Sequence, residues 1–355
     1  MALALSLGQR GQGCVWPNPA VGCVIVQGSR IVGRGWTQPG GRPHAEAMAL
    51  QQAGALAQRA TAFVTLEPCA HHGATPPCAD ALIAAGIARC VVAIADPDPR
   101  VSGKGISKLQ AARIEVNVGC QGQKALVAHR GFFNRLQNGR PRVTLKLATS
   151  FDGRIATASG ESQWITGFEA RRDVHGLRAC HDAVMVGGGT ARADNPNLTV
   201  RGLNLDRQPV RVVVSRHLDF DAPALQASRD VAPLWLCHAP QVRENDAWQT
   251  QCDALLQVPL APDGQLDLAA LMQALGSRGL TSVLCEGGGQ LAASLLRDQL
   301  VDDVILYTAG LALGADALPG LGDLTLSHLH LAPRFEFISV RKIGPDIRQD
   351  WRRLP

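Results

Sequence analysis

The sequence predicts an α/β protein with two domains, and three observations lead to this prediction. The chain has 355 residues, which is more than one ordinary domain. Strand-like and helix-like segments alternate through its first part and again through the remainder, as they do in layered α/β folds. Hydrophobic residues make up 46% of the chain and charged residues 18%, which is typical of a globular protein with a sizeable core.

The first domain is expected to open with a strand pair. Residues 20–26 (AVGCVIV) and 30–36 (RIVGRGW) are apolar segments on either side of a short turn at 27–29. An alanine-rich segment with the apolar spacing of a helix follows Pro43. Further strands are predicted at 61–66, 88–97 and 114–119, and a helix that ends in glycine at 78–86.

Polar and turn-forming residues interrupt this pattern at 136–142 (LQNGRPR) and predict a domain boundary there. We therefore expect one domain at 1–141 and a second at 142–355. The second domain opens with the strand-like segment VTLKLATS. Its other predicted strands lie at 182–187, 210–215, 233–238, 281–286 and 303–309, with a helix at 290–297.

Composition limits the classes of partner. The net charge of +5 is mild and the Lys and Arg residues are dispersed, which favours small anionic ligands over nucleic acid. One Tyr and eight Phe leave few side chains for base stacking. The ten cysteines are scattered, no secretory signal precedes them, and no apolar run approaches the roughly 20 residues that span a bilayer. We expect a protein of the reducing cytoplasm, with no nucleic-acid or membrane partner.

A zinc site is predicted from four residues. His44 and Glu46 lie two apart at the start of the helix after Pro43, and Cys69 and Cys78 follow. Histidine nitrogen and cysteine thiolate are zinc ligands, and a catalytic site with three of them keeps its fourth position for water. Zinc would lower the pKa of that water, and Glu46 would move its proton. Zinc deaminases, in which HxE precedes PCxxC, use this arrangement.

The spacing departs from that signature, because the eight residues AHHGATPP separate the two cysteines. Isolated cysteines are often simply buried thiols, and an HxE pair can lie on a surface by chance. However, HAE, LEPC and PPC occur in order, each at a predicted strand-to-helix junction. The sequence therefore predicts a catalytic zinc at His44, Cys69 and Cys78.

Longer motifs resemble the bifunctional deaminase/reductases of riboflavin biosynthesis. The first domain contains PNPAVGCVIV, HAE, VTLEPCAHHGATPPCADALIAAGI and DPDPRVSGKG. The second contains LKLATSFDGRIATASGESQWIT, VGGGTARADNPNLTVR, CEGGGQLAASLL and KIGPDI. The resemblance spans essentially the whole chain. It implies a cytidine-deaminase-like three-layer sandwich followed by a dihydrofolate-reductase-like domain.

The same resemblance implies two reactions, with Zn²⁺ and NADPH as the cofactors. The first is hydrolytic deamination of 2,5-diamino-6-ribosylamino-4(3H)-pyrimidinone 5′-phosphate. The second is reduction by NADPH of the ribosyl group of 5-amino-6-(5-phosphoribosylamino)uracil to ribityl. We further expect the chain to form a homo-oligomer.

Glycine triplets mark the reductase half. Gly187–Gly189 and Gly287–Gly289 each follow a predicted strand, where backbone N–H groups at a helix N-terminus can bind a phosphate. Alone, such triplets can also be tight turns, and neither is a GxGxxG motif. By motif position, the resemblance implies that the cofactor contacts Ala148, Trp164, Thr190, Asp194, Ser215, Gly288, Gly289, Gln290, Leu291, Ala292, Ala293 and Ser294. It implies that the substrate contacts Ser162, Arg178, Leu198, Arg201 and Glu286.

Charged side chains fit these ligands. Arg178 and Arg201 suit a phosphate because a guanidinium forms bidentate, charge-assisted hydrogen bonds. Lys146 and Asp152 are expected near the reacting ribose, the alternative being solvated charges at a strand end. Arg216 follows the strand at 210–215, where a cation would favour the 2′-phosphate of NADPH; the alternative is an exposed loop charge.

Several residues depart from the family pattern in the deaminase half, among them Val15, Ala47 and three that bear on phosphate binding. Ala70 and Ala74 stand where the family usually has a serine and a basic residue, and Asp98 stands where asparagine is usual. A lost cation and an added carboxylate are expected to weaken binding of the substrate phosphate and raise the KM of deamination. A reductase with an impaired or vestigial zinc domain is therefore the alternative function.

Two other classes compete with this interpretation. A nucleic-acid-editing deaminase shares HAE and the zinc, but PCxxC, a basic surface and a single domain are expected of it. A structural zinc site needs a fourth protein ligand, and His71 or His72 could supply one. The family resemblance implies instead that His71 contacts the substrate.

Overall fold

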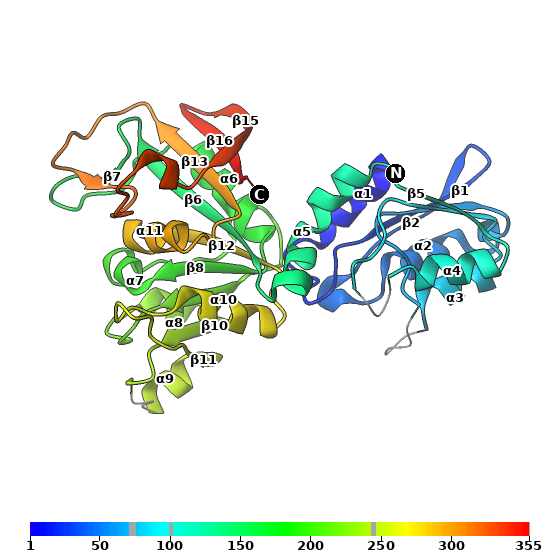
Figure 1. Ribbon diagram of the computed structural model, residues 1–355, viewed down its shortest axis with the longest axis horizontal. Helices are drawn as coiled ribbons and strands as arrows, with labels where there is room; N and C mark the ends of the chain where they lie inside the picture. The colour runs from blue at the N-terminus through cyan, green and yellow to red at the C-terminus, as the bar shows by residue number, and fades with distance from the viewer. Residues whose placement is uncertain (71–75, 99–101, 243–245, 355) are drawn as a thin grey trace. The chain divides into compact units, whose positions relative to one another are not determined.

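The computed structural model describes residues 1–70, 76–98, 102–242 and 246–354. The chain divides into two compact units, Met1–Gly139 and Arg140–Pro355, coloured blue to cyan and green to red in Figure 1. The division lies within the segment 136–142, where polar and turn-forming residues are concentrated.

Unit 1 has helices and strands in alternation along most of its length. Its helices are α1 (Ala2–Gly8), α2 (Ala45–Ala53), α3 (Cys78–Ala84), α4 (Lys104–Ala111) and α5 (Gly122–Asn138). Its strands are β1 (Gly22–Gln27), β2 (Arg30–Trp36), β3 (Thr61–Val64), β4 (Arg89–Val92) and β5 (Glu115–Val118). The strands form one sheet in the order β2-β1-β3-β4-β5, in which β3, β4 and β5 are parallel.

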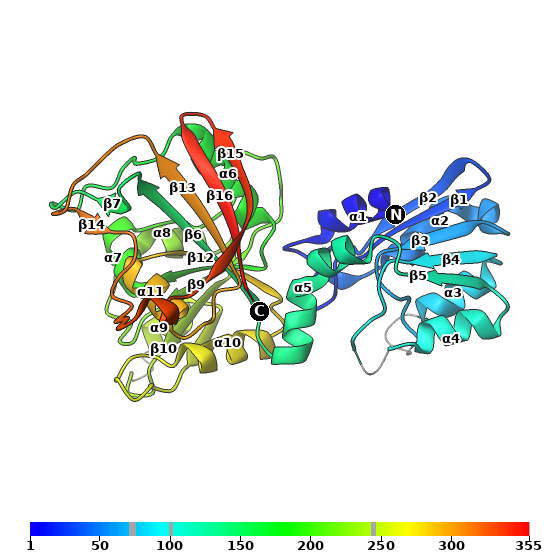
Figure 2. The same ribbon diagram turned by 45° about the horizontal axis from the view of Figure 1, so that its top comes forward.

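Neighbouring residues of β1 face opposite layers of unit 1, as the period of a strand requires. Cys23 and Ile25 belong to a core that also contains residues of α2, α3 and α4. Val24 packs instead against Ala4 and Leu7 of α1, and α5 lies beside α1 (Figure 2). The unit is therefore an α/β sandwich of three layers, which confirms the expected fold class.

Two glycines of β2 allow α2 to lie directly against the sheet. A Cβ atom on Gly33 would lie 2.2 Å from the carbonyl oxygen of Ala49, and one on Gly35 would lie 2.0 Å from that of Ala45. Such distances leave no room for any side chain. Because α2 begins at Ala45, this close approach also determines where His44 lies.

Unit 2 is the larger of the two. Its helices are α6 (Phe168–Ala179), α7 (Gly188–Asp194), α8 (Pro223–Ala227), α9 (Asp246–Gln251), α10 (Leu268–Ser277) and α11 (Gly289–Arg297). Its strands are β6 (Arg142–Ser150), β7 (Arg154–Ala156), β8 (Ala183–Gly187), β9 (Val210–Val214), β10 (Leu234–His238), β11 (Ala254–Gln257), β12 (Ser282–Gly287), β13 (Asp303–Ala309), β14 (Leu318–Pro319), β15 (Phe335–Ile343) and β16 (Asp346–Arg353).

One large sheet runs through unit 2 in the order β11-β10-β9-β8-β12-β6-β13-β16-β15. The strands from β11 to β13 are parallel, and the hairpin β15–β16 joins them antiparallel through β16. Helices α6 and α8 bury apolar side chains against this sheet. Since parallel strands end at one edge, the segments after β6, β8, β9 and β12 meet there, where ligands of open α/β sheets bind.

The structure shortens one predicted strand and adds elements that were not predicted. The predicted strand at 88–97 ends at Val92, because the N–H of Asp96 is hydrogen-bonded to the Glu67 carboxylate rather than to a neighbouring strand. Helices α5, α6 and α10 and the hairpin β15–β16 are present although the sequence pattern did not indicate them. Among the residues described, no helix is long and apolar enough to cross a membrane.

Candidate active sites

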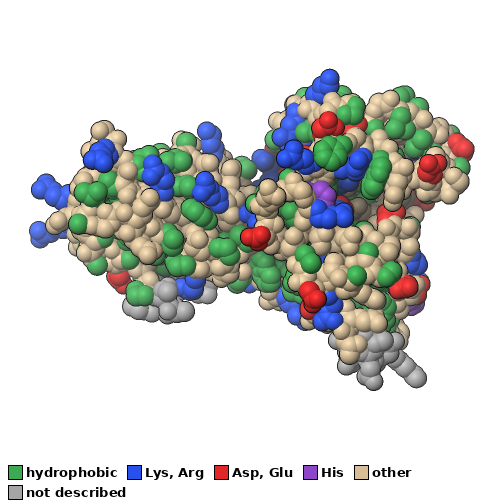
Figure 3. All heavy atoms as spheres, turned by 180° about the vertical axis from the view of Figure 1, so that it is seen from behind, with side chains coloured by type: hydrophobic (Ala, Val, Ile, Leu, Met, Phe, Trp, Pro, Cys, Tyr) green, Lys and Arg blue, Asp and Glu red, His purple; other side chains and the backbone are tan. Residues whose placement is uncertain are grey.

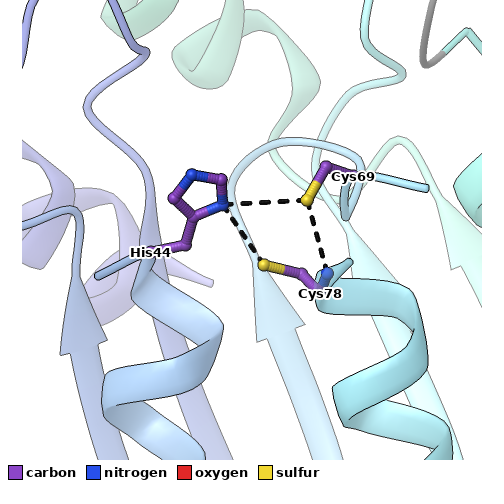
Figure 4. A group of neighbouring side chains, drawn as sticks. All are labelled: His44, Cys69 and Cys78. Carbon is purple, nitrogen blue, oxygen red and sulfur yellow. Dashed lines mark hydrogen bonds between the residues drawn. The ribbon is translucent and has the colours of Figure 1, made fainter. Parts of the chain in front are cut away.

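Two helix starts bring the predicted zinc ligands together in unit 1. His44 immediately precedes α2, and Cys78 is the first residue of α3. Cys69 lies in the segment after β3, and its carbonyl oxygen accepts the N–H of Ala79 at 3.1 Å. Figure 4 shows the imidazole of His44 and the two sulfur atoms facing one another.

The separations between these atoms fit a tetrahedral zinc ion. His44 Nδ1 lies 3.3 Å from Cys78 Sγ and 3.7 Å from Cys69 Sγ, and the three ligand atoms lie within 4.8 Å of one another. Zinc bonds of about 2.0–2.1 Å to nitrogen and about 2.3 Å to sulfur place such ligands roughly 3.6 Å apart in a tetrahedron. The three side chains are thus arranged to hold a metal without rearrangement.

The surroundings favour a thiolate at Cys69. Its sulfur is hydrogen-bonded by the Cys78 side chain, by His44 and by the Cys78 N–H, at 3.3 Å for the last of these. These hydrogen bonds lower the pKa of Cys69 to about 4. A thiolate is the form that binds zinc. The hydrogen bonds from His44 and Cys78, at the starts of α2 and α3, therefore favour the zinc-binding form of Cys69.

Glu46 lies in the first turn of α2, two residues after His44, and is 3% exposed. Burial raises the pKa of its carboxyl group, while the charge of His44 partly opposes this. A carboxyl whose pKa is raised toward neutrality can both take up and release a proton. Glu46 therefore has the position and the environment of a general acid/base.

A cavity of about 300 Å³ adjoins these residues. His44, Glu46 and Cys69 line it together with residues from distant parts of unit 1. The other lining residues are Pro17, Asn18, Pro19, Val21, Thr37, Arg42, Leu66, Glu67, Asp96, Asp98, Phe132 and Arg135. A cavity of this size can hold a small molecule such as a heterocyclic base.

Glu67 organises one wall of this cavity and was not predicted as a functional residue. Its carboxylate is 4% exposed and accepts backbone N–H groups from Asp96 at 3.2 Å, Gly103 at 3.0 Å, Gly105 at 2.9 Å and Ile106 at 3.2 Å. The sequence did offer one signal for Glu67: it is an acidic residue, in the motif LEPC, between an apolar strand and a predicted ligand cysteine.

Phe132 and Arg135 were also missed. Both lie on α5, three residues apart and therefore on one face of that helix, and both line the cavity. Asp98, one of the departures from the family pattern, lines it as well and is 4% exposed. The predictions for His71, His72 and Ala74 lie outside the described residues.

In unit 2, a buried ion pair joins two of the predicted residues, Arg178 and Glu286. Arg178 donates to Glu286 through Nε at 2.5 Å and Nη2 at 2.9 Å. Burial would raise the pKa of Glu286, but the Arg178 guanidinium outweighs this effect and the net pKa is lowered. Burial lowers the pKa of the Lys146 amino group, and the charges of Glu286 and Arg178 also act on it in opposite directions.

The segment that contains Leu198 and Arg201 is held beside this ion pair. Arg178 Nη1 donates to the carbonyl oxygen of Thr199 at 3.0 Å. The N–H of Arg201 is hydrogen-bonded to Nδ1 of His175 at 3.2 Å. The structure thus brings Arg178, Leu198, Arg201 and Glu286 into one place.

Several of the predicted cofactor residues lie at the carboxyl edge of the sheet. Strands β9, β8 and β12 are neighbours, and the segments that follow them carry Ser215, Thr190 and Gly288. A Cβ atom on Gly188 would lie 2.7 Å from Ser215 Oγ, and one on Gly288, whose φ is +73°, would lie 3.0 Å from Thr190 Oγ1. Glycine is needed at both places, which are the starts of α7 and α11.

Other predicted residues have different neighbours. The guanidinium carbon of Arg171 lies 4.5 Å from the centroid of the Trp164 ring, and Trp164 is 67% exposed. Ala148 lies on β6, opposite Tyr307 of β13, and Asp194 ends α7. No contact described for Ser162, Ala148 or Asp194 joins them to the glycine edge.

Two charged residues, Asp152 and Arg216, form hydrogen bonds with loop residues of unit 2. Asp152 accepts a hydrogen bond from Ser150 Oγ at 2.5 Å and from the N–H of Gly314 at 2.8 Å; these contacts lower the pKa of Asp152 to about 2. Arg216 donates to the carbonyl oxygen of Gly264 at 2.9 Å. The face of unit 2 drawn in Figure 3 gathers Lys and Arg side chains around a histidine, which favours an anionic ligand.

Two family models match the chain. Residues 1–94 match the zinc-binding region of cytidine and deoxycytidylate deaminases, and residues 141–348 match the RibD C-terminal domain. The first match covers His44, Cys69 and Cys78, so a zinc-binding deaminase domain is present and the reductase-only alternative is not favoured. The second match adds a reductase domain, and the two together imply zinc and a nicotinamide cofactor.

Whole-length relatives carry both domains in the same order. The riboflavin biosynthesis protein RibD of Escherichia coli is 44% identical over 98% of this chain and 96% of its own length. That of Haemophilus influenzae is 41% identical over 98% and 95%. A solved structure of Acinetobacter baumannii RibD has a TM-score of 0.87 at 37% identity, covering 99% of this chain and 97% of that one. The chain therefore belongs to the RibD family of bifunctional riboflavin-biosynthesis enzymes, which join a pyrimidine deaminase and an NADP-dependent reductase in one polypeptide.

Proposed function

We propose that His44, Cys69 and Cys78 hold a zinc ion and that Glu46 is the acid/base for deamination of 2,5-diamino-6-ribosylamino-4(3H)-pyrimidinone 5′-phosphate. The observation that carries this proposal is the spacing of the three ligand atoms, which fits tetrahedral zinc. When bound, zinc supplies the Lewis acidity that makes water a nucleophile at neutral pH.

Glu46 moves the protons of this reaction. Its buried carboxylate takes a proton from the attacking water at one Oε atom and gives a proton to the departing amino group. The ring carbon gains an oxygen, the C–N bond breaks and ammonia leaves. The raised pKa of Glu46 makes both transfers feasible near neutrality.

The cavity supports a substrate with a base and a phosphate. Phe132 offers an apolar ring, and Arg42 and Arg135 offer guanidinium groups on the lining. Guanidinium groups recognise phosphate by charge-assisted hydrogen bonds. These two cations support phosphate binding although Ala74 lacks the usual basic side chain and Asp98 adds a carboxylate.

For the second reaction, we propose that NADPH lies along the glycine edge of unit 2, against Ser215, Thr190 and the start of α11. When bound, NADPH supplies the hydride. Lys146, whose pKa is lowered by burial, donates the proton at Nζ to the ribosyl group that is reduced. Arg178, Arg201 and Glu286 orient the substrate, and Arg216 at the end of β9 supports the choice of NADPH over NADH.

We further propose a cytoplasmic homo-oligomer. None of the ten cysteines forms a disulfide, which supports a reducing compartment. The last strand of the large sheet, β15, carries Phe337, Ile338 and Val340 with 55%, 42% and 57% exposure. An apolar sheet edge of this kind is a surface on which a second copy of the chain can pair. Ultracentrifugation of the wild type and of Val340→Lys tests this assembly.

An assay that follows ammonia release and NADPH oxidation separately tests the two reactions. With the diamino substrate, we expect ammonia first and NADPH consumption afterwards. Glu46→Ala is expected to abolish ammonia release and leave reduction of a supplied deaminated intermediate intact. If that intermediate is reduced but wild-type protein releases no ammonia, the deaminase proposal fails and the zinc domain is vestigial.

A further inference from the structure

Helix α6 connects the two sides of the reductase site. Near its start, Arg171 packs against the ring of Trp164 with 4.5 Å between guanidinium carbon and ring centroid, and its Nη1 donates to Thr166. In its last turn, Arg178 forms the bidentate pair with Glu286. Between them, His175 is hydrogen-bonded to the N–H of Arg201. Any displacement of α6 would therefore move residues assigned to the cofactor and to the substrate together.

The start of α6 has no capping side chain of its own. Its N-cap residue is Gly167, which has no side chain that could accept an N–H group. The first N–H groups of a helix lack partners within the helix and carry a partial positive charge. An acceptor from elsewhere in the fold is therefore needed at this end.

Asp346, the first residue of β16 and part of the KIGPDI motif, supplies that acceptor. Its Oδ2 atom accepts the N–H of Gly167 at 2.7 Å, and the residue is 2% exposed. The bond joins residues 179 positions apart in the chain. A carboxylate placed there neutralises the helix end as well as satisfying its N–H group.

The turn between β15 and β16 is seated on the same helix end. A Cβ atom on Gly167 would lie 2.8 Å from Pro345, and one on Gly344, whose φ is +58°, would lie 2.5 Å from the Glu169 carboxylate. One turn further along α6, Asp173 accepts Nη1 of Arg348 at 2.6 Å and the hydroxyl of Tyr307 at 2.5 Å. The hairpin thus contacts α6 at two points, Gly167 and Asp173.

We infer that Asp346 is a positioning residue for the reductase reaction: through α6, it sets the placement of Trp164 and of the Arg178–Glu286 pair. The inference rests on the proposed assignment of these residues to cofactor and substrate. It gives the last structural element of the chain a part in catalysis without contact to either ligand.

The test compares full-length Asp346→Ala and Asp346→Asn with a control, Glu336→Gln, which removes an exposed carboxylate from β15 of the same hairpin. For each protein, kcat and KM for NADPH and for the deaminated intermediate are measured, together with ammonia release and Tm. Ammonia release reports on unit 1 in the same molecules and serves as an internal standard for intact protein.

We expect Asp346→Ala to lower reductase kcat/KM about tenfold or more, because a displacement of 1 Å in a site can cost about a hundredfold. Asp346→Asn keeps a hydrogen-bond acceptor but loses the charge. We therefore expect its reductase kcat/KM to fall about threefold, in line with the energy of a charge near a helix end. Ammonia release should match the wild type in both variants, and Glu336→Gln should match it in every constant.

Unchanged reductase constants in both variants overturn the inference, even if Tm falls, because Asp346 would then only stabilise the fold. If Asp346→Ala does not fold, unchanged constants in Asp346→Asn alone overturn it. Absence of NADPH oxidation by the wild type would instead refute the proposed reductase function.

Discussion

Glu67→Gln provides a strong test of how the deaminase cavity is held together. Each carboxylate oxygen of Glu67 accepts two backbone N–H groups: Oε2 those of Asp96 and Gly103, and Oε1 those of Gly105 and Ile106. A glutamine amide keeps one oxygen, so two of the four N–H groups would face an NH₂ group. Hydrogen bonds to charged groups contribute about 1.5–3 kcal/mol each, so the loss of two is at least about 3 kcal/mol.

For a unit of this size, such a loss corresponds to a fall in Tm of about 10 °C. Differential scanning calorimetry should show the lower transition in unit 1 alone. Because Asp96 and Asp98 line the cavity on the segment that Glu67 organises, the KM of deamination should also rise, while NADPH oxidation with a supplied deaminated intermediate stays unchanged. Glu115→Gln is the control: it alters an exposed ion pair between Glu115 of β5 and Arg89 of β4, and it should change Tm very little. Unaltered melting and unaltered KM in Glu67→Gln would refute this account of the cavity wall.

Other predictions test the remaining parts of the two sites. Arg178→Met should abolish reduction and cost about 3–5 kcal/mol of stability by leaving a buried carboxylate unpaired, whereas Arg172→Met on the same helix should do neither; calorimetry and NADPH oxidation decide. Burial lowers the pKa of His129 from 6.5 to about 4, so its neutral form stabilises unit 1 above pH 6.5. As the pH falls from 6.5 to about 4, the free energy of unfolding of unit 1 should fall by about 3 kcal/mol. His129→Gln should flatten this dependence of Tm on pH. Arg135→Gln should raise the KM of deamination at least fivefold, and the exposed control Lys124→Gln should not; equal KM values would remove Arg135 from phosphate binding. A chelator should stop ammonia release but not NADPH oxidation with a supplied deaminated intermediate, and one equivalent of zinc should restore ammonia release; loss of both activities would contradict two separate sites.

Local patterns were sufficient to predict that His44, Cys69 and Cys78 lie together. His44 and Cys78 each stand at a helix start that proline and apolar spacing mark in the sequence, and Cys69 follows a predicted strand. The same reasoning predicted the parallel strands of unit 2, because β8, β9, β10 and β12 are short, apolar runs bounded by turn residues. Such signals lie within a few residues of what they predict.

Long-range partners could not be predicted in this way. Glu67 is bound by N–H groups about 30 to 40 positions further along the chain, and Asp346 by one 179 positions away. Their roles depend on tertiary contacts that no local pattern encodes. Helix α5 was missed for a related reason: its sequence is largely polar, and its importance comes from the two side chains it contributes to the cavity.

The position of α5 has a practical consequence for dissecting the enzyme. The matched zinc-binding region ends at residue 94, yet the cavity wall formed by Phe132 and Arg135 lies some 40 residues beyond that point. A deaminase fragment cut at the end of the recognisable motif would keep every metal ligand but lack part of its binding cavity. A fragment intended to work alone must extend to Gly139, the last residue of unit 1, which directly follows α5.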